Sequence, residues 1–420
     1  PMNLLVIPSW YPHRCYPWEG VFLLEQARAI AESRPDWNVA LSLWGQGEAF
    51  LSTAHLLHSP RCLGDALALR AGERDLARNL VEFLTPALWW PERVFGGNKA
   101  ALLRANRTNL ERATRRFGRI DLMHAHVSYP AGWLALRLSE ETGIPYVLTE
   151  HMGPFPLSVY ARSDGVLKPT LREPLERAAA RIAVSPMLAR TIARFGILEP
   201  EVVPNLIDER LYRSDPPPDP EHLTFFTLCV MDPVKGVSDL LKGAARFLGD
   251  LPERDRPRAR FRIGGGGPLL AQHRREAHEL RLDANLAWLG QIPRAQARDE
   301  FARCDCFVLT SRHESFGIVF VEAGACGRPV IATACGGPEH IVAPETGVLV
   351  GVGDIEGIAG ALRFMFENAR AYDAAGIRRR TIERFGREAV VGRLESVYRR
   401  VLASSEPRDS GAQGPAGAGT

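Results

Sequence analysis

Residues 306–323 read Cys-Phe-Val-Leu-Thr-Ser-Arg-His-Glu-Ser-Phe-Gly-Ile-Val-Phe-Val-Glu-Ala. The first four residues are apolar and predict a buried strand, and a helix is expected to begin near Phe316 after a short loop. A strand that is apolar on both faces and is followed by a helix is the repeating unit of a parallel sheet covered on both sides. This unit decides the fold because it recurs along nearly the whole chain.

Short apolar runs alternate with amphipathic stretches in both halves of the sequence. In the first half, strands are expected at 3–7, 39–43, 121–124, 146–149, 181–184 and 202–203, and helices at 21–32, 131–141 and 187–195. The second half repeats the pattern, with strands at 224–230, 260–263, 286–289, 306–309 and 329–332 and helices beginning near Val237, Pro268, Arg294, Phe316 and Asp354. We therefore predict an α/β protein with two doubly wound, Rossmann-like domains facing each other across a cleft. Ligands are expected at the carboxyl ends of the strands.

The two halves are separated by Ser214-Asp-Pro-Pro-Pro-Asp-Pro220, in which four prolines forbid regular structure. We predict domains at 1–213 and 221–385, joined by a linker at 214–220. The residues from 404 to 420 have nothing to bury and are expected to form a disordered tail.

Composition and charge limit the function classes. The chain has 420 residues, of which 45% are hydrophobic, and 52 Lys plus Arg stand against 49 Asp plus Glu. The formal net charge of +3 is too small to indicate a nucleic-acid-binding protein. The seven cysteines are scattered, and the one close pair, Cys304 and Cys306, is interpreted as two small core residues, because a zinc site requires wider spacing and a second pair.

The location is inferred from segments that the sequence does not contain. The chain enters a strand directly at its start, without a pattern typical of a signal peptide. The longest charge-free stretch, 122–136, is too short and too polar to span a bilayer. We expect a reducing, cytoplasmic location.

Two carboxylates flank the beginning of the helix near Phe316. Glu314 lies in the loop and Glu322 inside the helix, and Gly317 between them permits close approach of a ligand. Backbone N–H groups at a helix N-terminus attract phosphate. The helix rises roughly 7.5 Å from Gly317 to Glu322, so the two carboxylates could bracket a diphosphate. Taken alone, a helix-capping acid followed by a solvated Glu is an equally good interpretation.

The segment 314–322 resembles the E-x₇-E element of retaining GT-B glycosyltransferases, in particular glycosyltransferase family 4, also called glycosyl transferases group 1. Other short motifs follow in the family's order over nearly the whole chain. They are 8–12 with 19–22, 121–126 with 131–132, 143–145, 149–151, 204–208, 235–236, 264–268, 289–290, 336–339 and 346–347 with Asp354.

The resemblance implies a metal-independent transferase. It would move a hexose-type sugar, with retention of configuration, from a UDP- or GDP-linked donor to the hydroxyl of a glycan or lipid-linked saccharide in bacterial polysaccharide or glycoconjugate biosynthesis. Residues 1–213 would bind the acceptor, 221–385 would bind the nucleotide sugar, and a helix at 386–403 would cross back to the first domain. A sugar-nucleotide 2-epimerase or phosphorylase of the same architecture, or an inactive nucleotide-sugar-binding protein, stays open as an alternative.

The resemblance also implies roles for single residues. Glu314 would contact the transferred sugar, Glu322 the nucleotide ribose, and Lys235 the leaving phosphate, where a fixed cation stabilises developing charge. His126 would face the sugar and the acceptor, so that His126, Glu314 and Lys235 form the catalytic set, and His151 would help bind the acceptor. The remaining donor-binding positions would be Gly20, Gly265, Gly266, Phe316, Gly317, Ile318 and Val319.

The sequence departs from the family's pattern at one position, and two motifs typical of other enzyme classes are absent. The family usually has an Arg five residues before this Lys, but Val230 stands there, and Arg312 is a candidate replacement. The glycines at 264–267 do not complete a dinucleotide-binding fingerprint, because Leu270 stands where Gly or Ala is required. The sequence contains no Asp-x-Asp, the element that metal-dependent sugar-nucleotide enzymes use to hold a divalent ion on the diphosphate, so no metal cofactor is expected.

The segment 93–119 concentrates positive charge, with eight basic residues and one acid. Leu103, Leu110 and Phe117 recur at seven-residue spacing, and Trp89 and Trp90 precede them. A basic amphipathic helix with nearby aromatic residues could rest on an anionic membrane, at the inner face of the plasma membrane. A helix docked on the first sheet, with a solvated basic face, explains the pattern equally well.

Overall fold

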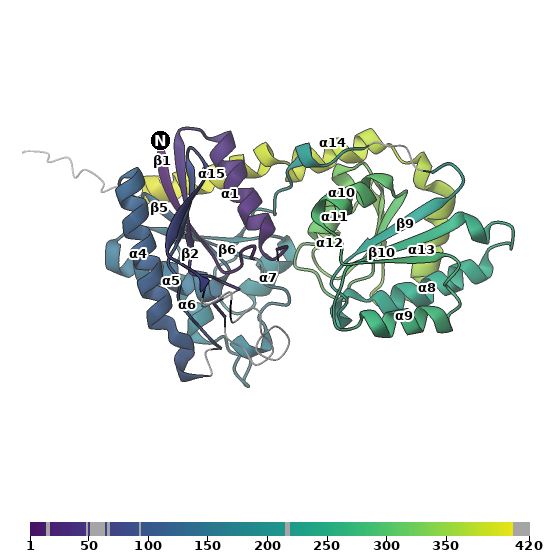
Figure 1. The fold of residues 1–420 in the computed structure, drawn as a ribbon, viewed down its shortest axis with the longest axis horizontal. Helices are drawn as coiled ribbons and strands as arrows, with labels where there is room; N and C mark the ends of the chain where they lie inside the picture. Colours follow the sequence, from purple (N-terminus) through teal and green to yellow (C-terminus); the bar gives the residue numbers. More distant parts are fainter. Residues whose placement is uncertain are drawn as a thin grey trace, which may run out of the picture.

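The computed structural model describes residues 1–13, 17–47, 49–50, 64, 68–91, 94–214 and 219–405. The chain folds into two α/β lobes that lie side by side (Figure 1). Most of the proline-rich segment expected as a linker, and residues 406–420 of the expected tail, lie outside the described residues. Residues 404 and 405, expected to belong to the disordered tail, are instead the end of a helix.

The N-terminal domain is built on an eight-stranded sheet in the order β3-β4-β2-β1-β5-β6-β7-β8. The pairs are parallel except β3–β4, which is antiparallel. Its strands are β1 (Met2–Pro8), β2 (Trp37–Leu43), β3 (Gly72–Ala77), β4 (Leu80–Leu84), β5 (Leu122–His126), β6 (Tyr146–Glu150), β7 (Ala180–Ala183) and β8 (Glu201–Val202). Its α-helices are α1 (Val21–Ser33), α4 (Lys99–Phe117), α5 (Trp133–Thr142), α6 (Pro169–Arg177) and α7 (Pro186–Ala193).

The C-terminal domain has a six-stranded, fully parallel sheet in the order β11-β10-β9-β12-β13-β14. Its strands are β9 (Leu223–Leu228), β10 (Ala259–Gly264), β11 (Leu286–Gly290), β12 (Cys306–Leu309), β13 (Val330–Thr333) and β14 (Gly347–Val350). Its helices are α8 (Val237–Asp250), α9 (Leu270–Glu279), α10 (Arg294–Arg303), α11 (Ile318–Ala325), α12 (Pro338–Ile341) and α13 (Ile355–Asn368).

Both faces of the first sheet are covered, as a doubly wound fold requires. Leu5 and Ile7 of β1 join one buried apolar cluster, whereas Leu4 and Val6 join another on the opposite face, because successive side chains of a strand point to opposite sides. The predicted architecture of two parallel-sheet domains is therefore confirmed.

The differences from the expected elements are local. The bounds of the expected strands agree with those in the structure to within two residues, but β3, β4 and β14 were not expected. The helices expected near Pro268 and Phe316 begin two residues later, at Leu270 and Ile318. On the edge strand β3, charged residues 73–75 are exposed, so it carries no apolar run that a sequence pattern could reveal.

The last two helices connect the lobes (Figure 1). α14 (Ala374–Phe385) lies beside the C-terminal domain and α15 (Arg387–Ser405) beside the N-terminal domain. The α15 side chain of Glu395 accepts a hydrogen bond of 2.6 Å from Arg34, and Tyr398 lies 2.7 Å, OH to Nδ1, from His124 on β5. The residues expected to cross back to the first domain thus lie in α15.

Helix α4 docks on the N-terminal sheet through its apolar side. Leu102, Leu110 and Ala113 are buried, and Leu103 and Phe117 pack partly buried against the same core. In the part of the chain that the structure describes, no helix combines the length and the apolar character needed to cross a bilayer.

Candidate active site

In each sheet the strand order changes direction at the first strand of the domain, β1 or β9, and the expected catalytic residues lie at these two points. In the C-terminal sheet β9 pairs with both β10 and β12. Lys235 follows β9 and Glu314 follows β12. In the N-terminal sheet β1 pairs with both β2 and β5, and His126 ends β5. A crevice for ligands forms beyond the carboxyl ends of the strands where the order reverses.

Lys235 and Glu314 form a direct ion pair. Lys235 Nζ lies 2.7 Å from Glu314 Oε1, and the two side chains are 24% and 11% exposed. Burial lowers the pKa of Lys235, but the charge and hydrogen bond of Glu314 outweigh burial and raise that pKa above its ordinary value. The ammonium therefore stays charged at neutral pH.

The backbone around Lys235 is fixed from both sides. The Asp232 carboxylate accepts hydrogen bonds from the N–H groups of Val234 and Lys235, at 2.9 and 3.1 Å. Gly236 has φ +62°, and a Cβ there would lie 2.0 Å from the carbonyl oxygen of Thr310. The loop after β9 is thus locked against the end of β12.

The loop that carries Glu314 is equally constrained. Ser311 Oγ donates to Glu314 Oε1 at 2.8 Å, and the Glu314 carbonyl accepts from Gly337 N at 2.7 Å. Gly317, at φ +90°, is the N-cap of α11. The first N–H groups of that helix, at Ile318 and Val319, have no acceptor within the helix, so they are available to an anion.

The Phe316 side chain is part of the core and does not line the site. It is 2% exposed, and its ring lies 5.8 Å from that of Phe385 in an edge-on arrangement. A donor contact at this position could come only from its backbone.

The glycine loop after β10 packs tightly on the loop after β9. Gly265 has φ +120°, and a Cβ there would lie 1.8 Å from the Cys229 carbonyl oxygen. Gly266 accepts a hydrogen bond of 2.8 Å from Met231 N. Both glycines therefore bring the backbone close to the segment that leads to Lys235.

The expectation that Arg312 replaces the missing Arg is not met in this structure. Val230 is 47% exposed and contributes no charge. The Arg312 guanidinium is instead paired with Asp239 on α8 at 2.7 Å. Because Arg312 is held by this partner, Lys235 is the cation that faces Glu314.

Three histidines form a buried group in the N-terminal domain. His126 Nδ1 lies 3.0 Å from His151 Nε2, and the rings of His124 and His126 are 4.1 Å apart. Burial lowers the pKa of His124 and of His151 to about 3 and holds that of His126 well below its ordinary value. All three rings are neutral at pH 7.

Glu150 and Ser315, which the sequence did not single out, connect this group to the donor loop. The buried Glu150 carboxylate accepts from the N–H groups of His151 and Met152, each at 2.8 Å, and so fixes the loop after β6. Ser315 Oγ donates to the His151 carbonyl oxygen at 3.0 Å across the domain boundary. The hydrogen bond made by Ser315, the residue after Glu314, therefore links the Lys235–Glu314 pair to the histidine group.

Gly20 lies at the start of α1, close to the histidine group. Its φ is +64°, and a Cβ there would lie 2.5 Å from the Trp10 carbonyl. Two residues later, the ring of Phe22 is 5.1 Å from that of His151.

Glu322 lies apart from the pair, in a polar cluster between the domains. Tyr212 donates to Glu322 Oε1 at 2.6 Å, and Arg294 Nη2 lies 3.8 Å from the same oxygen. Arg294 also pairs at 2.8 Å with Glu25 of α1. Burial raises the pKa of both Glu25 and Glu322. Tyr212, Arg294 and Glu25 come from three separate elements, and no sequence motif predicts their meeting.

Comparison with known proteins decides the family. Residues 66–211 match the family described as Glycosyltransferase Family 4, and residues 208–384 match Glycosyl transferases group 1. The D-inositol 3-phosphate glycosyltransferase of Streptosporangium roseum is 31% identical over 317 residues, which cover 68% of this chain and 71% of that protein. This chain is a family 4 glycosyltransferase.

Solved structures show that this glycosyltransferase has the GT-B fold. Sucrose-phosphate synthase from Thermosynechococcus elongatus is similar with a TM-score of 0.71 at 18% identity, covering 96% of this chain and 100% of that one. Anabaena HepE in complex with UDP is similar with a TM-score of 0.65 at 17% identity, covering 95% and 100%. The family membership predicted from the order of the motifs is confirmed.

Proposed function

We propose that this glycosyltransferase moves a hexose-type sugar from a UDP- or GDP-linked donor to an acceptor hydroxyl with retention of anomeric configuration. The acceptor would be a glycan or a lipid-linked saccharide of bacterial polysaccharide or glycoconjugate synthesis. The observation that carries the proposal is the Lys235–Glu314 pair at the reversal point of the C-terminal sheet, beside the N-terminus of α11. The UDP bound in the HepE structure supports a nucleoside diphosphate as the leaving group.

In the proposed reaction, the bond between the anomeric carbon and the diphosphate oxygen breaks as the acceptor oxygen attacks from the same face. The acceptor proton passes to the departing diphosphate. Lys235 and the first N–H groups of α11 stabilise the charge that develops on that leaving group. Glu314 positions the sugar, so no separate acid and nucleophile are required, unlike in retaining hydrolases.

The buried histidines suit a role in orientation. His126, at 1% exposure and with a neutral ring, can exchange hydrogen bonds with a sugar or acceptor hydroxyl but is a poor proton acceptor at neutral pH. His151 fixes the ring of His126 and contacts Ser315 through its own carbonyl. We propose that this link aligns the acceptor side with the donor side.

Donor binding tests the proposal before any acceptor is known. A ligand that binds the folded state selectively raises its melting temperature. We expect UDP- or GDP-sugars to raise Tm, and Lys235→Ala to abolish most of the shift. Lys242→Ala is the matched control, because Lys242 is 52% exposed and lies 3.9 Å from Glu276. Equal shifts in the Lys235→Ala and wild-type proteins would contradict the assigned role.

We propose that catalysis requires no metal ion. Lys235 and the N-terminus of α11 supply the positive charge that a divalent ion provides in metal-dependent transferases. EDTA should therefore leave the transfer rate nearly unchanged. A large loss of rate that Mg²⁺ restores would refute this part of the proposal.

We further propose a peripheral contact with anionic membrane, made by the outer face of α4. Arg107 and Arg112 pair with Glu141 and Glu73, but Arg104 and Arg115 of the helix, and Arg119 just beyond its end, are exposed. Since the apolar side of α4 is buried, the contact would be electrostatic. Co-sedimentation with liposomes should then increase with anionic lipid and decrease with salt. Binding that does not depend on anionic lipid content or on salt concentration would contradict this proposal.

A further inference from the structure

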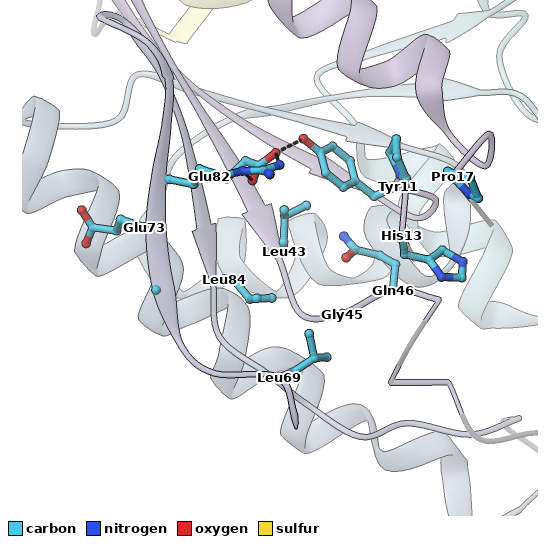
Figure 2. A pocket seen from close by; sticks show the side chains of 13 residues that line it. Tyr11, His13, Pro17, Leu43, Gly45, Gln46, Leu69, Glu73, Glu82 and Leu84 are labelled. Atoms are coloured by element: carbon cyan, nitrogen blue, oxygen red, sulfur yellow. Dashed lines mark hydrogen bonds and ion pairs between the residues drawn. The ribbon is translucent and has the colours of Figure 1, made fainter. Parts of the chain in front are cut away.

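Glu82 and Glu322 are both largely buried carboxylates that lie beside a tyrosine and an arginine, and their side chains are 7% and 13% exposed. Glu82 lies on the wall of a cavity of about 610 Å³ in the N-terminal domain (Figure 2). It accepts from Tyr11 OH at 2.5 Å and from two nitrogens of Arg74 at 2.6 and 2.7 Å. Arg74 binds both oxygens of Glu82, so this carboxylate is committed to the fold.

Glu322 has the same kinds of neighbour, but its arginine is held elsewhere. Tyr212 donates to Glu322 Oε1 at 2.6 Å, whereas Arg294 Nη2 stays 3.8 Å from that oxygen. Arg294 instead donates to Glu25 of α1 at 2.8 Å. Among the described residues, Tyr212 is the only hydrogen-bond donor to the Glu322 carboxylate, so Glu322 keeps capacity for a ligand.

Glu322 is placed to meet the nucleoside part of the proposed donor. It follows Ile318, the first residue of α11, by about one turn of helix. The first N–H groups of α11 are available to the diphosphate, and Glu314, which precedes them, is the carboxylate proposed for the sugar. A diphosphate held between the two carboxylates would leave Glu322 for the ribose, whose hydroxyls can donate to it.

Glu25 also balances the charges around this site. A second guanidinium, that of Arg298, lies 4.0 Å from Glu25 and 5.7 Å from the centre of the Tyr212 ring. Two carboxylates therefore face two guanidiniums. Without the charge of Glu25, both guanidiniums would have Glu322 as their carboxylate, and Arg294 would close on it as Arg74 closes on Glu82.

We propose that Glu25 is a positioning residue of the nucleotide site: by holding Arg294, it keeps Glu322 open for the ribose hydroxyls of a nucleoside diphosphate. Glu25 belongs to the N-terminal domain, whereas Arg294 and Glu322 belong to the C-terminal domain. Recognition of the ribose therefore depends on contact between the two domains. This inference rests on the proposed function and adds a residue of the N-terminal domain to donor recognition.

Nucleotides that differ only in the ribose hydroxyls test the proposal without an acceptor. The dissociation constants of UDP, GDP and their 2′,3′-dideoxy forms can be measured by isothermal titration calorimetry on the full chain. Because hydrogen bonds to a charged group are strong, the wild-type protein should bind the ribonucleotide at least about ten-fold more tightly than its dideoxy form. In Glu25→Gln this ratio should fall below about three-fold, through weaker binding of the ribonucleotide and not of the dideoxy form.

A second substitution separates positioning from a general loss of structure. Adding Arg294→Ala to Glu25→Gln removes the cation that would occupy Glu322, so the ratio should return toward the wild-type value. Glu32→Gln is the matched control, because Glu32 also lies on α1 and its ion pair, at 2.8 Å, is with Arg387. The control should keep the wild-type ratio.

Three results would overturn this inference alone: an unchanged ratio in Glu25→Gln, equal weakening of both nucleotides in that variant, or a double variant whose ratio stays as low as that of Glu25→Gln. Failure of the proposed function has a different signature. It would appear as binding of neither UDP nor GDP to the wild-type protein, and it would overturn this inference as well. The comparison of wild type with Glu25→Gln does not depend on the stability of the double variant.

Discussion

The fold holds Lys235 and the buried histidines in opposite charge states. Lys235 is kept charged by Glu314, whereas His124, His126 and His151 are kept neutral by burial. A fixed cation is useful where the leaving group gains charge, and neutral rings are useful where hydroxyls must be oriented. In the proposed reaction these two functions would lie in separate domains, which the hydrogen bond from Ser315 to His151 connects.

The histidines predict how stability depends on pH. An unfolded chain protonates them near pH 6.5, but in the fold the pKa values of His124 and His151 are about 3. The unfolded state therefore binds more protons below pH 6.5, and stability, fully present above that pH, should fall as the pH falls toward 3. Each histidine contributes up to about 1.4 kcal/mol per pH unit. The free energy of unfolding, measured by chemical denaturation at pH 7 and pH 5, should depend less on pH in His124→Gln than in wild type. An equal pH dependence in the two proteins would contradict this account.

At the scale of elements, short glycine turns hold the site in place. Gly236→Ala should destabilise the protein by more than about 1 kcal/mol from its backbone conformation alone, and the contact with Thr310 adds to that loss. Gly249→Ala, in an open position of α8, should instead stabilise by roughly 0.5–1 kcal/mol. Chemical denaturation measures both, and a stable Gly236→Ala protein with normal donor binding would show that the turn is dispensable.

The same scale shows what sequence patterns can and cannot predict. The strand expected at 306–309 matches β12 residue for residue, because four buried apolar residues in a row leave little choice. β4 was missed because it carries Glu82 in its centre, which only the partners Tyr11 and Arg74 make tolerable in a buried position. The closeness of Lys235 and Glu314, 79 residues apart, could be expected from topology, since both follow strands at the reversal point. The partners of Glu322 could not be expected from the sequence, because they depend on how the two domains meet.

For the whole molecule, the cluster of Glu25, Arg294, Tyr212 and Glu322 contributes to the interface between the domains. Arg294→Ala would leave Glu25 and Glu322 as neighbouring carboxylates without their nearest cation. We expect the free energy of unfolding to fall by about 1–3 kcal/mol, a loss moderated because Arg294 is 36% exposed. Adding Glu25→Gln to the Arg294→Ala protein should recover part of the lost stability. Arg399→Ala is the control, since its pair with Glu395 is a surface one and Arg399 is 64% exposed. A double variant no more stable than Arg294→Ala would contradict this interpretation.

The stereochemistry of transfer tests the central claim most directly. The protein should be incubated with the α-linked UDP- or GDP-sugar that stabilises it and with a panel of glycoside acceptors, and the anomeric configuration of the product read by NMR. The account predicts an α-linked product from the wild-type protein and at least a ~100-fold loss of kcat/KM in Lys235→Ala. A β-linked product, or a wild-type rate in Lys235→Ala, would contradict it.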